Sequence, residues 1–156
     1  MKLAEALAER ADAVRKLNEL RSRIEANATY QEGEEPSEDA AALLREADAA
    51  VTRLEVLMRR INQTNTTARL ADGRSITEAL ARRDALRLRY SLLDGAADAA
   101  SGSRGRGFGR QLRSELATLS ALDVPALRAQ ADEVSKELRK LDLQVQEANW
   151  QVDLVD

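Results

Sequence analysis

The chain has 156 residues, of which 44% are hydrophobic, 33% are charged and only 3% are aromatic, and it has no histidine and no cysteine. This length suits one domain with a sizeable core, and the scarcity of proline and aromatic residues favours long helices. The net charge of −3 argues against a general polyanion-binding surface, and the missing histidine and cysteine exclude disulfides, zinc–thiolate sites and Ser-His-Asp triads. We therefore expect an all-α, or nearly all-α, single domain over residues 1–156 that uses no cofactor.

The first predicted helix covers about residues 2–30. Its apolar residues recur at helical spacing, but Arg10 and Arg21 fall where the stripe would otherwise be apolar. Long arginine stems can cover apolar surface while the guanidinium reaches water or a carboxylate, so we interpret both as packing residues. The apolar stripe consists of Leu3, Leu7, Val14, Leu17 and Ile24.

An acidic turn at residues 31–39 follows this helix. Its carboxylates could bind a hard cation, but the turn lacks the alternating Asp/Asn ligands of a calcium loop, and acidic residues are common at helix entries. We therefore favour a solvated turn and keep metal binding as the alternative. The carboxylates are Glu32, Glu34, Glu35, Glu38 and Asp39.

The second predicted helix covers about residues 37–64, with Ser37 as a capping residue after Pro36. Its apolar stripe is broad, which suits a helix of a bundle better than one of an isolated two-stranded coil. The main stripe is Ala40, Leu44, Ala47, Val51, Leu54, Met58 and Ile61, widened by Leu43, Ala50 and Leu57.

The third predicted helix covers about residues 75–99. Ser75 and Glu78 have the spacing of a capping box at its start. Just before it, Asp72 and Gly73 form a turn signal between short arms. Residues 68–75 therefore predict either a small β-hairpin or a tight connection.

A basic, glycine-rich segment at residues 101–110 predicts a flexible loop. Its cations and aromatic ring resemble the composition of segments that contact nucleic acids or other anions. The segment is too short to neutralise many phosphates, so we do not expect nucleic acid as a partner and keep this contact as an alternative. The residues concerned are Arg104, Arg106, Phe108 and Arg110. Residues 111–122 fit a helix or a short strand.

The fourth predicted helix covers about residues 123–152. Asp123 can cap its first turn, and Pro125 lies where a first-turn proline is tolerated. The apolar residues alternate steps of three and four without interruption, as in a heptad seam. The seam is Val124, Leu127, Ala131, Val134, Leu138, Leu141, Val145, Ala148 and Val152.

These elements predict an antiparallel four-helix bundle with long, coiled-coil-like helices. The apolar stripes are broader than one thin hairpin can cover, so we also predict a homo-oligomer. The chain opens without an apolar leader, and its longest apolar run, residues 40–44, is too short to span a bilayer. We therefore expect a cytoplasmic protein that has no membrane partner.

Several stretches across the chain are distinctive: residues 1–7 (MKLAEAL), 31–36 (QEGEEP), 61–65 (INQTN), 70–83 (LADGRSITEALARR) and 147–150 (EANW). Together they resemble a family of small bacterial proteins that often carry the label septicolysin or DIP-type hypothetical protein. The resemblance covers nearly the whole chain, and the stretch at 70–83 is its most specific part. It implies a compact, self-associating helical protein with no established reaction and no catalytic residues to carry over.

Our leading hypothesis is a non-enzymatic, self-associating helical module for structure or protein interaction. Two alternatives stay open: a nucleic-acid-binding protein that uses the basic loop, and a carboxylate-metal protein or enzyme. Without histidine or cysteine, catalysis would depend on carboxylates, lysine, tyrosine or an oxygen-ligated metal. No catalytic or cofactor-binding residue is predicted.

Overall fold

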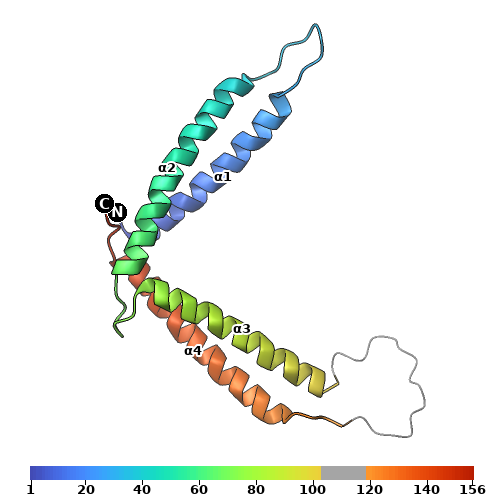
Figure 1. The fold of residues 1–156 in the computed structure, drawn as a ribbon, viewed down its shortest axis with the longest axis vertical. Helices are drawn as coiled ribbons and strands as arrows, with labels where there is room; N and C mark the ends of the chain where they lie inside the picture. Colours follow the sequence, from blue (N-terminus) through green and yellow to red (C-terminus); the bar gives the residue numbers. More distant parts are fainter. Residues whose placement is uncertain (103–118) are drawn as a thin grey trace, which may run out of the picture. The chain divides into compact units, whose positions relative to one another are not determined.

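The computed structural model describes residues 1–102 and 119–156. The described residues form four helices, α1 (Leu3–Asn27), α2 (Ala40–Thr67), α3 (Ile76–Ala100) and α4 (Val124–Gln151), and no strand (Figure 1). The all-α class is therefore confirmed, and the four predicted helices are present with slightly shifted ends. None of the helices in this part of the chain is long and apolar enough to cross a membrane.

The described residues fall into two compact units. Unit 1 contains Met1–Thr77 and Gln146–Asp156 and is built on the hairpin of α1 and α2. Unit 2 contains Glu78–Val145 and is built on most of α3 and α4. The organisation as a single domain over residues 1–156 stays a prediction.

In unit 1, α1 packs along the antiparallel α2 (Figure 1). One row of buried or half-buried residues of α1 alternates steps of three and four and so occupies heptad positions a and d. Arg10 takes one of these positions and is half-buried, whereas Arg21 is exposed and donates from its Nε to Glu25 over 2.8 Å. The a and d row is Leu3, Ala6, Arg10, Ala13, Leu17, Leu20, Ile24 and Asn27.

Helix α2 buries only part of its broad apolar stripe. Asp39 caps the helix, because its Oδ1 accepts hydrogen bonds from the backbone N–H groups of Ala41 and Ala42 at 2.9 and 3.0 Å. The row that packs in the hairpin contains the residues predicted to widen the stripe, while several residues of the predicted main stripe stay exposed. The buried or half-buried row is Leu43, Ala47, Ala50, Leu54, Leu57, Ile61 and Thr64.

The two ends of the chain pair with each other in unit 1. The backbone N–H of Leu3 donates to the carbonyl of Val152, and that of Leu154 donates to the carbonyl of Met1, both over 2.9 Å. Lys2 adds an ion pair of 2.9 Å with Asp153. Leu154 is buried, so the residues after α4 form part of the core of unit 1.

The same C-terminal residues also bind the last turns of α2. The Nε of Arg60 donates to the carbonyl of Val155 over 2.7 Å, and the buried Thr64 hydroxyl accepts the Val155 backbone N–H over 3.1 Å. Because Thr64 also donates to the carbonyl of Arg60, its hydroxyl is satisfied as donor and acceptor. The tail therefore joins α1 and α2 at this end of the hairpin.

The segment before α3 is a tight connection. Arg69 and Ser75 form an isolated antiparallel bridge, and the Leu70 backbone N–H donates to the carbonyl of Arg74 over 2.8 Å. Gly73 has a φ of +86°, a conformation that glycine adopts without strain. Of the two alternatives for residues 68–75, the structure therefore shows the tight connection, closed by one bridge and without a ladder of strands.

In unit 2, ion pairs flank the apolar seam between α3 and α4. Arg82 binds Glu137 over 2.8 Å on one side of the seam. On the other side, Arg128 binds Asp94 over 2.6 Å and Asp98 over 2.5 Å. Arg82 and Glu137 both occupy heptad g positions, and Arg128 and Asp94 both occupy e positions. In an antiparallel hairpin, one side of the seam therefore carries the g residues of both helices and the other side carries their e residues.

Candidate interaction face

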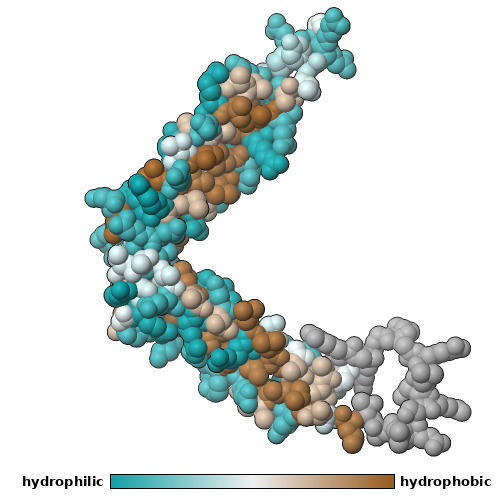
Figure 2. Space-filling model, viewed as in Figure 1, coloured by the Kyte–Doolittle hydropathy of each residue, from teal (hydrophilic) through white to brown (hydrophobic). Residues whose placement is uncertain are grey.

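The α1–α2 hairpin carries exposed apolar side chains along one side of its seam. The e positions of α2 are Leu44, Val51 and Met58, with 59%, 51% and 44% of their surface exposed. The e positions of α1 begin with Leu7, which is half-buried, and Val14, which is 44% exposed. Figure 2 shows apolar, brown surface along this hairpin. We call these five residues the apolar hairpin face.

The opposite side of the same seam is charged. Its g positions carry side chains of both signs, and the charge of Arg23 on α1 interacts with Glu46 on α2. The two sides of the hairpin therefore differ: one is suited to water and the other leaves large aliphatic side chains uncovered. The g residues are Glu9, Lys16 and Arg23 on α1 and Glu46, Arg53 and Arg60 on α2.

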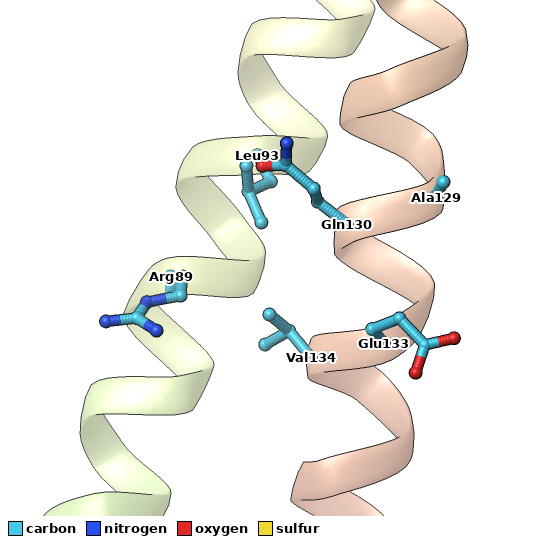
Figure 3. Close-up of a pocket in the computed structure, with 6 residues that line it drawn as sticks. All are labelled: Arg89, Leu93, Ala129, Gln130, Glu133 and Val134. Atoms are coloured by element: carbon cyan, nitrogen blue, oxygen red, sulfur yellow. The ribbon is translucent and has the colours of Figure 1, made fainter.

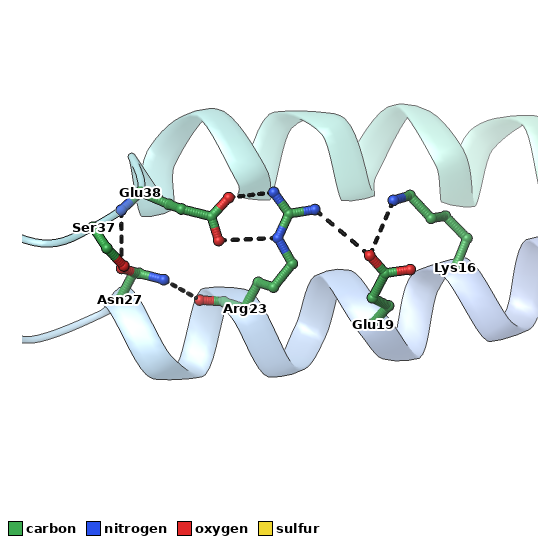
Figure 4. Close-up of polar contacts among 6 residues, drawn as sticks. All are labelled: Lys16, Glu19, Arg23, Asn27, Ser37 and Glu38. Carbon is green, nitrogen blue, oxygen red and sulfur yellow. Dashed lines mark hydrogen bonds and ion pairs between the residues drawn. The ribbon is translucent and has the colours of Figure 1, made fainter.

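The loop end of the hairpin is held by a polar cluster (Figure 4). Arg23 forms two hydrogen bonds to the Glu38 carboxylate, and its Nε lies 3.0 Å from Oε2. These hydrogen bonds, opposed by partial burial, hold the pKa of Glu38 below its usual value. The buried Asn27 side chain accepts from the Ser37 hydroxyl and the Glu38 backbone N–H at 2.9 and 3.0 Å, and donates to the carbonyl of Arg23.

The acidic turn is thus partly built into the hairpin. Glu38 pairs with Arg23, and Asp39 caps α2. In the described residues, no three carboxylates come together in a group that could hold a metal ion. Tyr30, Glu34, Glu35 and residues at the end of α1 and the start of α2 line a shallow depression of about 710 Å³.

The basic loop residues Arg104, Arg106, Phe108 and Arg110 lie outside the described residues. The structure therefore does not test the predicted contact with nucleic acid or another anion. The same holds for residues 111–118, so the alternatives of helix and strand stay open there.

Unit 2 has an open depression of about 690 Å³ between α3 and α4 (Figure 3). Leu93 and Val134 lie between the two helices, while Arg89 and Glu133 point away from each other. The lining thus combines an apolar floor with separated charges, and does not bring an acid and a base together. This arrangement is that of a groove between two packed helices.

The sequence signal for the apolar hairpin face was the width of the α2 stripe. Periodicity showed that α2 has more apolar positions than one neighbour can cover, but it could not tell which row packs against α1. The short C-terminal tail and Arg60 were not singled out, because five irregular residues after a helix carry no periodic signal.

Comparisons with known proteins agree with this helical architecture. Residues 10–154 match a family of unknown function, DUF6847. A crystal structure of a functionally unknown conserved protein from Corynebacterium diphtheriae is similar, with 37% sequence identity, a TM-score of 0.88 and coverage of 99% of each chain. No curated protein matches the chain, and neither similarity carries the septicolysin label. The chain therefore belongs to the family of unknown function DUF6847.

Proposed function

We propose that this protein is a non-enzymatic helical module that associates with itself through the apolar hairpin face. The observation that carries the proposal is the exposed row Leu44, Val51 and Met58 on α2, beside Leu7 and Val14 on α1. Exposed apolar surface on this scale often marks an interaction site, and apolar e positions next to a heptad seam are typical of helices in bundles.

The energetics support association. Fully burying a large aliphatic side chain contributes roughly 1.5–3 kcal/mol, so half-exposed residues contribute about 1 kcal/mol each when a partner covers them. The contributions of two copies add up, and rigid helices lose little conformational entropy on binding. The polar residues around the face, such as Arg21 and Asp48, supply a rim that water can reach.

Two matched variants of α2 test this proposal. Val51→Glu places a charge in the apolar hairpin face, whereas Thr52→Glu places the same charge on the next, outward-facing residue. Size-exclusion chromatography with light scattering should give a dimer mass for the wild type and for Thr52→Glu. For Val51→Glu we expect at least a roughly tenfold weaker association, with unchanged helical circular dichroism. Equal masses for both variants would refute the assignment of the face.

A further inference from the structure

Contacts at the two ends of the α1–α2 hairpin fix which residues of α1 and α2 lie at the same height along the helix axes; we call such residues level. At one end, the tail binds the carbonyl of Met1 through Leu154 and the hydroxyl of Thr64 through Val155. At the other end, Asn27 binds the backbone of Glu38. Since both helices rise by the same amount per residue, the residues between can be matched. Level pairs on the apolar hairpin side are Leu7 with Met58, Val14 with Val51, and Arg21 with Leu44.

Two copies can cover each other's apolar hairpin faces in two symmetric ways. If the two-fold axis is perpendicular to the helices and lies in the plane of the interface, α1 lies on the second copy's α1 and α2 lies on its α2. With the axis along the hairpins, α1 lies on the second copy's α2, and every neighbouring pair of helices is antiparallel. Both arrangements bury the same apolar residues, so the charges at the margins of the face decide between them.

The margin of α2 carries Asp48 and Glu55, both at heptad b positions, and these side chains form no ion pair with any other described residue. The margin of α1 carries Arg21 and Glu25, joined to each other over 2.8 Å. The rest of the α1 margin is small or neutral: Ala4, Ala11 and Asn18.

In the arrangement with α2 on α2, an axis that crosses the middle of the face, at Val14 and Val51, covers the apolar residues of both copies. Asp48 then comes beside Glu55 of the second copy, twice by symmetry, and Arg21 comes beside the apolar Leu7. Like charges side by side and a cation on an apolar residue disfavour this arrangement. It therefore has the poorer electrostatic match.

In the arrangement with α1 on α2, the same charges are complementary. Arg21 comes within about one helical turn of Asp48 of the second copy, a reach that an arginine side chain spans. Glu25 falls beside the small Ala41 of the second copy, and Glu55 falls beside the small Ala11. By symmetry each of these contacts occurs twice.

We propose that the partner of the apolar hairpin face is a second copy whose α2 lies on this chain's α1, with both hairpins pointing the same way and with Arg21 beside the second copy's Asp48. This inference rests on the proposed self-association and adds its geometry. It joins two hairpins into a four-helix bundle whose core is extended by Leu7, Val14, Leu44, Val51 and Met58 from each copy.

Disulfide cross-linking tests this geometry directly, because the natural chain has no cysteine. Val14→Cys and Val51→Cys are made as separate variants, one with a size tag, then mixed and oxidised. The proposed geometry predicts that cross-linked product is almost entirely the mixed Val14→Cys to Val51→Cys species, while either variant alone gives little product. Thr52→Cys mixed with Val14→Cys is the matched control and should cross-link far less.

Other outcomes overturn the geometry in distinguishable ways. Cross-linking of each variant with itself would show α1 on α1 and α2 on α2. A dimer mass without specific cross-linking would place the interface elsewhere, while self-association itself would stand. A monomer mass before oxidation would overturn the proposed function as well as the geometry.

A charge exchange gives a second readout: Arg21→Glu and Asp48→Arg should each weaken the dimer several-fold, and the double variant should recover most of the loss.

Discussion

Single polar residues close the loop end of the α1–α2 hairpin. Asn27 is buried and uses its amide as both donor and acceptor, which ties the last turn of α1 to Ser37 and to the start of α2. Arg23 binds Glu38 in the same region. From the sequence, the acidic turn was expected to be solvated. Glu32, Glu34, Glu35 and Asp39 are exposed. Glu38 and Asp39 also have structural roles, because an arginine one turn before the end of α1 and the free N–H groups of α2 lie within their reach.

Replacing Asn27 by alanine should destabilise unit 1. The change leaves the Glu38 backbone N–H and the Ser37 hydroxyl without their acceptor, so we expect the free energy of unfolding to fall by about 1–2 kcal/mol. Urea unfolding followed by the fluorescence of Trp150, the chain's single tryptophan and part of unit 1, measures this loss. Asn18→Ala, at an exposed position of the same helix, is the control and should change stability by less than about 0.5 kcal/mol.

The carboxylates also set the pH dependence of stability. Arg23, Arg74 and Lys2 lower the pKa values of Glu38, Asp72 and Asp153 by hydrogen bonding to them. A carboxylate whose pKa is lowered by folding stabilises the folded state above its unfolded pKa, and this stabilisation is lost as the pH falls through the folded pKa.

We therefore expect the urea midpoint to be nearly constant between about pH 5.5 and 7, where the absence of histidine leaves no side chain with an ordinary pKa to titrate. It should fall below about pH 4.5, where these carboxylates gain protons. Glu38→Gln should lower the midpoint at neutral pH and make the acid decline shallower. An unchanged decline in this variant would show that the Arg23–Glu38 pair does not contribute.

At the scale of whole elements, the sequence predicted the helices well because their heptad patterns are long. The α4 seam is buried or half-buried along its full length, as expected from its uninterrupted steps of three and four. In α2, periodicity gave the right helix but could not choose between two adjacent apolar rows. That choice depends on α1, which packs on the row containing Leu43, Leu54 and Ile61 and leaves Leu44 and Val51 exposed.

The role of the C-terminal tail, residues 152–156, cannot be predicted from sequence patterns, because it depends on contacts with residues far away in the chain. Leu154→Ala tests that role. Truncating this buried side chain should destabilise unit 1 by about 2–3 kcal/mol and increase hydrogen exchange at the first turn of α1. Leu143→Ala, at an exposed position of α4, should have little effect. Equal effects of the two substitutions would contradict a packed tail.

At the scale of the molecule, the two hairpins carry different kinds of side chain beside their apolar seams. The α3–α4 hairpin has ion pairs on both sides, including Arg82 with Glu137 and Arg128 with Asp94. The α1–α2 hairpin has charges on one side and aliphatic side chains on the other. The composition alone could not reveal this contrast, because the 33% of charged residues is an average over the whole chain.

The central claim is that a second copy covers the apolar side of α1 and α2, and sedimentation equilibrium of the unaltered protein tests it most directly. At micromolar concentration we predict a mass of twice the 17.2 kDa chain, with dissociation only on strong dilution. Because apolar burial is the main driving force, the dimer should persist in 1 M sodium chloride, where exposed ion pairs are screened. A mass of 17.2 kDa at every concentration would contradict the claim.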